Sequence, residues 1–133
     1  MEAHEIVQVG MQKETVFEVE EKYTASHVGS GSLRVLATPS IIAFMEITAR
    51  ALLEEVLPEG YSSVGVHVDV RHLAPTPLGA QVRVECKVID VKAQRVEFDF
   101  QAWDDKDKIG EGRHQRVVID VGRFLKRVEA KKG

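Results

Sequence analysis

The chain has 133 residues, a net charge of −3 at pH 7 and 44% hydrophobic residues, which predicts one folded domain spanning residues 1–133. A nucleic-acid-binding protein that relies on bulk electrostatics carries a basic surplus, so this charge argues against a nucleic-acid partner. The single cysteine, Cys86, excludes a disulfide within the chain and disfavours a cysteine-based metal cluster. We therefore expect no metal and no tightly held cofactor.

The start of the chain, MEAHEIVQVG, lacks a positively charged segment followed by an apolar one, so it predicts no secretory signal. No apolar run approaches the ~20 residues that a membrane-spanning helix needs. We expect no membrane partner and a cytoplasmic location.

The first half of the chain predicts extended segments, a loop and one long helix. Residues 5–23 contain two extended candidates, and the Ser- and Gly-rich residues 24–35 form a loop. The helix is expected to begin near Thr38 and Pro39 and to end near Leu57, before Pro58 and Gly60. Its first half is apolar on nearly every side, which is typical of a helix buried all round.

The second half predicts four strands and a short C-terminal helix. Alternating apolar residues mark the strands around 64–70, 82–88, 96–102 and 109–121, and the break in alternation at 88–91 predicts a bulge. Close connections between consecutive strands favour an antiparallel meander. Because a sheet with one apolar face needs a cover, the sequence predicts an α+β fold in which a curved antiparallel sheet wraps around the long helix.

Three residues are candidates for chemistry. Glu46 lies in the most apolar part of the helix, where it either pairs with Arg50 four residues on or serves a function. His72 continues the apolar alternation of the strand at 64–70, where it is either a core residue or an acid–base group facing the helix. Thr38 fits the helix N-cap, and a helix N-terminus also suits a thioester carbonyl or its oxyanion.

The spacing of Thr38 and Glu46 adds a constraint. Eight residues separate them, about 12 Å along a straight helix at ~1.5 Å per residue, so the two side chains cannot hydrogen-bond directly. If they share a site, either the helix is bent at its start or the site joins two chains.

Other polar residues carry weaker signals. Ser40 lacks the G-x-S-x-G context of a hydrolase nucleophile, and Cys86 fits a small packed residue on a strand. The basic side chains of the later strands are either CoA phosphate ligands or ordinary surface charges: Lys87, Lys92, Arg113 and Arg116.

Residues 35–46 (VLATPSIIAFME), 63–65 (SVG), 70–79 (VRHLAPTPLG) and 109–119 (IGEGRHQRVVI) resemble the hotdog-fold thioesterases related to fluoroacetyl-CoA thioesterase. The resemblance covers most of the chain from about Val16 onward. It implies a hotdog fold, hydrolysis of a small acyl-CoA or carrier-bound thioester, and a homodimer or dimer of dimers with the pantetheine arm between subunits.

The resemblance also assigns residues. Thr38, Glu46 and His72 match the catalytic threonine, glutamate and histidine of the family, and Gly65 matches the glycine of the acyl pocket. Pro39, His114 and Arg116 are expected to contact substrate. Direct attack by water and an acyl-enzyme intermediate both remain open. The fluoroacetate-specific member of the family has an aromatic lid segment before its catalytic threonine. Residues 29–35 (GSGSLRV) contain no aromatic residue here, which argues against selectivity for fluoroacetyl-CoA.

Two other functions compete with hydrolysis on the same fold. One is a non-catalytic acyl-CoA-binding or sensing module, which would not need Thr38, Glu46 and His72 together. The other is an acyl-CoA hydratase or dehydratase. The usual Asp-x(4)-His arrangement of that enzyme is missing, since Asp69 and His72 are three residues apart and are expected on opposite faces of their strand.

Overall fold

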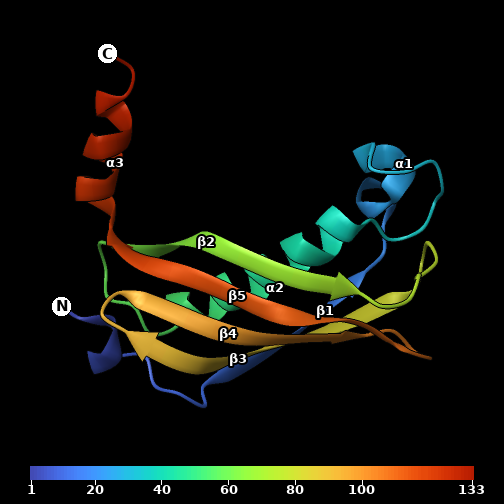
Figure 1. The fold of residues 1–133 in the computed structure, drawn as a ribbon, viewed down its shortest axis with the longest axis horizontal. Helices are drawn as coiled ribbons and strands as arrows, with labels where there is room; N and C mark the ends of the chain where they lie inside the picture. Colours follow the sequence, from blue (N-terminus) through green and yellow to red (C-terminus); the bar gives the residue numbers. More distant parts are fainter.

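The computed structural model describes residues 1–133 and is built on one antiparallel sheet of five strands (Figure 1). From one edge to the other the strands are β1 (Gln12–Glu18), β3 (Gln81–Lys92), β4 (Arg95–Trp103), β5 (Lys108–Asp120) and β2 (Tyr61–His72). Helix α2 (Thr38–Glu54) runs across one face of the sheet. The predicted α+β arrangement of a sheet and one long helix is confirmed.

Strands β3 and β4 form the centre of the core because buried residues alternate with more exposed ones along β4 and along β3 up to Val88. Their buried residues pack against α2: Val82, Val84, Cys86, Val88, Val96, Phe98, Phe100 and Ala102. The register between the two strands shifts between Val88 and Asp90, which confirms the predicted bulge.

The strand order differs from a simple meander, because β2 pairs with β5 at the sheet edge and not with β3. The connection from β2 to β3 contains Pro75, Pro77 and Gly79, so it cannot form a tight hairpin. Instead it crosses the end of the sheet, where the Leu36 N–H donates to Thr76 O and the Gly79 N–H donates to Val19 O.

Strand β2 departs from the regular alternation that the sequence predicted. Its register with β5 shifts between Gly65 and His67, so Val66 is an additional residue. Val64 pairs with Val117 on the outer face, whereas Val68 pairs with the buried His114 on the inner face. The prediction that residues 64–72 share one face is therefore wrong for Val64, which precedes the bulge, and right for Val68 to His72, which follow it.

Helix α2 is not buried all round in the single chain, contrary to the prediction. One side packs on the sheet through Ile41, Phe44, Met45 and Leu52, whereas Ile47 is 45% exposed. On the edge strand, Val66 is 47% exposed and Val68 is 40% exposed. Apolar side chains are therefore exposed both on α2 and on β2, which has one unpaired edge.

The remaining segments follow the prediction in part. The N-terminal region holds one strand, β1, and two 3-10 turns at Ala3–Glu5 and Glu21–Tyr23 instead of two extended segments. The expected loop at 24–35 contains one helical turn, α1 (Ala25–Val28). The C-terminal helix α3 (Val121–Ala130) projects from the end of β5, and the Asp120 side chain caps its start (Figure 1). No helix has the length and apolarity to cross a membrane.

Phe44 tests the packing of α2 on the sheet, because its ring stacks on Phe17 with centroids 4.1 Å apart and is fully buried. We expect Phe44→Ala to lower the free energy of unfolding by about 3–5 kcal/mol, as for other buried aromatic residues. Val16→Ala removes a side chain on β1 that is 57% exposed and should change it by less than about 0.5 kcal/mol. Urea denaturation at one protein concentration measures both, and equal effects would contradict this packing.

Candidate active site

Thr38 and His72 form the first part of the site. Thr38 is the first residue of α2, His72 is the last residue of β2, and Thr38 Oγ1 lies 2.7 Å from His72 Nδ1. The predicted N-cap is wrong, because Ala37 occupies the cap position and the Thr38 side chain turns to the histidine instead. A hydroxyl hydrogen-bonded to an imidazole is the arrangement of a nucleophile and its general base.

The environment of His72 favours its neutral form. Burial lowers the pKa of His72 below its usual value of 6.5. Its other ring nitrogen, Nε2, is buried and has no hydrogen-bond partner within the chain. When the Thr38 hydroxyl donates to Nδ1, the proton of the imidazole resides on Nε2, and Nδ1 is ready to accept the hydroxyl proton.

A cleft of about 280 Å³ opens beside this pair. Apart from Thr38 and His72, its lining is apolar and comes from two segments: Val35, Leu36, Leu73, Ala74 and Pro75. The cleft thus combines an apolar wall with one pair of polar groups, which suits an uncharged group held next to a reactive centre.

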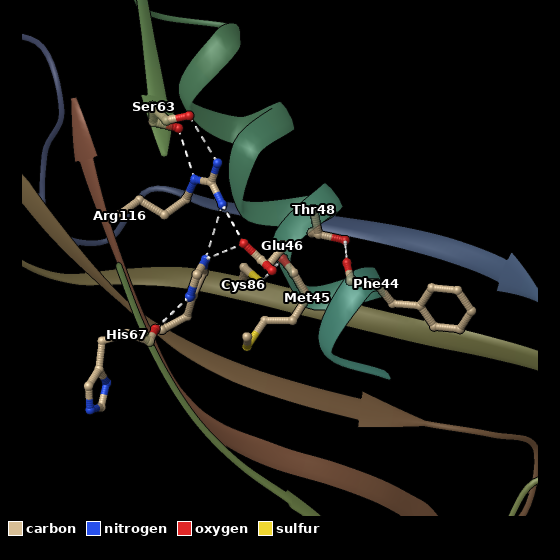
Figure 2. A network of polar contacts seen from close by, with 9 residues as sticks. Phe44, Met45, Glu46, Thr48, Ser63, His67, Cys86 and Arg116 are labelled. Carbon is tan, nitrogen blue, oxygen red and sulfur yellow. Dashed lines mark hydrogen bonds and ion pairs between the residues drawn. The ribbon is translucent and has the colours of Figure 1, made fainter. Parts of the chain in front are cut away.

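Glu46 forms the second part of the site and does not pair with Arg50. Arg50 contacts Glu54, with Nε and Oε1 3.6 Å apart, whereas Glu46 Oε2 accepts a hydrogen bond from Arg116 Nη1 at 3.2 Å. Figure 2 shows the Glu46 carboxylate extending from α2 toward the Arg116 guanidinium. The Glu46 side chain is 41% exposed, so it is less buried than its apolar sequence neighbours suggested.

Gly65 leaves the space that the Glu46 carboxylate occupies. A Cβ atom at this position would overlap Glu46 Oε2 and would lie 3.2 Å from His114 Cε1. A residue larger than glycine would therefore displace the carboxylate from β2. The sequence had assigned Gly65 to the acyl pocket, and the structure places it directly beneath Glu46.

Arg116 and His114 point to the inner face of the sheet. His114 is fully buried and Arg116 is 5% exposed, and the guanidinium is held by Ser63, Glu46 and His114. This placement does not suit the predicted contact of Arg116 with a CoA phosphate. Sequence reasoning did not single out Ser63, although it shares the inner face with its β5 neighbour Val118.

The remaining candidates form no side-chain hydrogen bond with Thr38, His72 or Glu46. Pro39 is exposed at the second position of α2, and Arg113 contacts Asp99 on the outer face of the sheet. Cys86 is buried, and burial raises the pKa of its thiol to about 12, so it packs as an uncharged residue. Asp69 pairs with Arg113 on the outer face, opposite in direction to His72, as the strand pattern predicted.

Within one chain the site is divided into two halves. Thr38 and His72 meet at the start of α2, and Glu46 lies two helical turns further on, about 12 Å along the helix axis at ~1.5 Å per residue. The helix is continuous between them, so a bend at its start does not bring them together.

Comparisons with known proteins match this chain to one family and one fold. Residues 19–122 match the family model described as fluoroacetyl-CoA-specific thioesterase. The fluoroacetyl-CoA thioesterase of Streptantibioticus cattleyicolor is 33% identical over 97 residues, which cover 73% of this chain and 70% of that protein.

Solved structures agree with the family match. A crystal structure of the fluoroacetyl-CoA thioesterase FlK superposes with a TM-score of 0.88 at 29% identity, covering 94% of this chain and 97% of that chain. A hot-dog-like protein from Thermanaerovibrio acidaminovorans superposes with a TM-score of 0.92 at 30% identity, covering 100% and 98%. The fold and the family together define a hotdog-fold thioester hydrolase. The chain belongs to the fluoroacetyl-CoA-specific thioesterase family, which confirms the resemblance seen in the sequence.

The lowered pKa values of two histidines predict a pH-dependent stability. Burial lowers the pKa of both His72 and His114 in the folded chain below 6.5, so the unfolded chain binds more protons as the pH falls. The free energy of unfolding should therefore decrease as the pH drops below about 6.5, in addition to any effect of the carboxylates. Urea denaturation at pH 7.5 and pH 5.5 measures this decrease, which His114→Asn should reduce. An unchanged pH dependence in that variant would contradict the assignment.

Proposed function

We propose that the protein hydrolyses the thioester of a small acyl-CoA, or of a carrier-bound acyl group, to the free acid and the thiol. The observation that carries this proposal is the Thr38–His72 hydrogen bond of 2.7 Å beside an apolar cleft, in a chain of a thioesterase family. In the reaction an oxygen–carbon bond forms at the carbonyl, the carbon–sulfur bond breaks, and the thiolate takes up a proton.

The position of Thr38 at the start of α2 supports a role at the thioester carbonyl. A helix N-terminus carries a partial positive charge, which stabilises the negative oxygen that develops during attack. His72 can accept the proton of the Thr38 hydroxyl for a direct attack by threonine, or it can hold the hydroxyl while water attacks. Both routes need a neutral His72, in line with its lowered pKa.

We propose a homodimer in which Glu46 of one chain completes the site of the other. The exposed apolar side chains on α2 and on β2 support this assembly, because exposed valines on an unpaired strand edge favour strand pairing. Antiparallel pairing of two β2 strands about the middle of residues 65–72 brings Gly65 of one chain next to His72 of the other. The Glu46 carboxylate lies over Gly65 and would then face the partner's Thr38–His72 pair.

The substrate is proposed to be broader than fluoroacetyl-CoA. Residues 29–35, of which Val35 lines the cleft, contain no aromatic side chain, and Leu33 in this segment is exposed. The cleft itself is lined by aliphatic residues and proline. An open aliphatic cleft accommodates uncharged acyl groups of different sizes, whereas it offers no group that would select a single small one.

Thiol release from a panel of acyl-CoAs, from acetyl to long-chain and aryl groups, tests the proposed activity. We expect hydrolysis of at least one of them, and a loss of about 10²–10⁴-fold in kcat/KM for both His72→Ala and Glu46→Gln. Circular dichroism and melting temperature confirm that the variants remain folded. If no thioester is cleaved while acyl-CoA raises the melting temperature, the protein is a binding module instead.

A further inference from the structure

Arg116 is a charged residue on the inner face of a sheet, where charge is costly unless it is paired. Its side chain is 6% exposed, so it has little contact with solvent in the single chain. A guanidinium in such a place needs hydrogen-bond acceptors for most of its five N–H groups. The acceptors that Arg116 finds indicate its role in the site.

Four hydrogen bonds fix the guanidinium in one orientation. Arg116 Nε donates to Ser63 Oγ at 2.8 Å, and Nη2 donates to the Ser63 carbonyl at 3.1 Å. Nη1 donates to Glu46 Oε2 and to His114 Nε2, both at 3.2 Å. Figure 2 shows Ser63 on one side of the guanidinium and Glu46 on the other. Ser63 therefore holds the two guanidinium nitrogens, Nε and Nη2, that do not contact Glu46.

His114 is oriented so that its ring can accept a hydrogen bond from Arg116. Its Nδ1 donates to the carbonyl of His67 at 2.8 Å, so the other nitrogen, Nε2, carries the lone pair. Burial lowers the pKa of His114, which keeps the ring neutral. A protonated ring would have no lone pair for Arg116 and would place a second positive charge against it.

We infer that Arg116, oriented by Ser63 and His114, is a positioning residue that fixes the carboxylate of Glu46 over Gly65 for thioester hydrolysis. The inference rests on the proposed function, and it assigns Arg116 and His114 to the support of Glu46. Arg116 fixes Oε2 of Glu46 and leaves Oε1 for the reaction. Gly65 provides the space, and Arg116 determines which way the carboxylate points within it.

Arg116 is the charged group that holds the Glu46 carboxylate in place. The ionisable groups nearby are Arg116 and His114 on β5 and Arg50 on α2, and Arg50 contacts Glu54 instead. Since His114 is neutral, Arg116 is the one cation in direct contact with the Glu46 carboxylate. Removing this cation should leave the carboxylate free to rotate away from its position over Gly65.

The variants Arg116→Gln and Arg116→Lys test this positioning in the native protein. We expect Arg116→Gln to lower kcat about 10²-fold with little change in KM. Arg116→Lys retains the charge but loses the planar guanidinium, so kcat should fall less. Arg95→Gln, which removes an exposed arginine from the outer face of β4, is the matched control.

A double-mutant cycle with Glu46→Gln distinguishes positioning from a general loss of structure. If Arg116 acts through Glu46, then adding Arg116→Gln to Glu46→Gln should lower kcat by less than about threefold further, because the group it positions is already gone. His114→Asn, which can keep the bond to the His67 carbonyl and loses the acceptor for Arg116, should give a smaller loss of the same kind.

The outcomes separate this inference from the proposed function. If the native protein cleaves no acyl-CoA, the proposed function and this inference both fail. If Glu46→Gln is inactive but Arg116→Gln behaves like Arg95→Gln, only the inference fails. An additive loss in the double variant, or a fall in melting temperature that alone accounts for the lost activity, also overturns it. Arg116→Lys keeps the test decisive if the glutamine variant does not fold.

Discussion

The pairing of Glu46 with the buried Arg116 constrains the arrangement of the whole site. Arg116 is fixed to β2 through Ser63 and to β5 through its own backbone, so the carboxylate that it binds is held against the middle of the sheet edge. Thr38 and His72 meet at the end of the same edge strand. A single chain therefore carries both parts of the site and keeps them apart.

The exposed apolar residues of the chain are consistent with a site whose two parts lie apart in one chain. The apolar sequence of α2 predicts a fully buried helix. In one chain, however, Ile47 on α2 is exposed, as are Val66 and Val68 on β2. Covering apolar side chains on a helix and on an unpaired strand edge with a second surface stabilises the protein. In the proposed dimer a second copy of the chain would cover these side chains and would supply the carboxylate, so one assembly would account for both features.

The sequence predicted much of the fold because burial alternates regularly where the core is densest. The stripes of β3 and β4, their bulge and the long helix follow from local periodicity alone. The position of β2 beside β5 cannot be predicted from local periodicity, because strand order depends on how the segment at 73–80 crosses the sheet. The bulge at Val66 was also missed, because the alternation of valines continues unbroken through it.

The site was predictable to a similar extent. Thr38, Glu46, His72 and Gly65 were identified from their pattern and from the family resemblance, whereas the partners of Glu46 were not. Arg116 and Ser63 lie 70 and 17 residues from Glu46 in the chain, and their contacts depend on the pairing of β2 with β5. A charged residue on a strand looks like a surface residue until the faces of the strand are known.

Subunit complementation is the measurement that tests most directly whether two chains form one site. Thr38→Ala and Glu46→Gln chains, each inactive alone, are mixed under conditions that allow subunit exchange. A mixed dimer contains one site with an intact Thr38–His72 pair and an intact Glu46, so an equal mixture should recover about a quarter of the native activity. Mixing Thr38→Ala with His72→Ala should recover none, because both changes affect the same half of the site. No recovery in the first mixture, with exchange confirmed by mass spectrometry, would contradict a site shared between two chains.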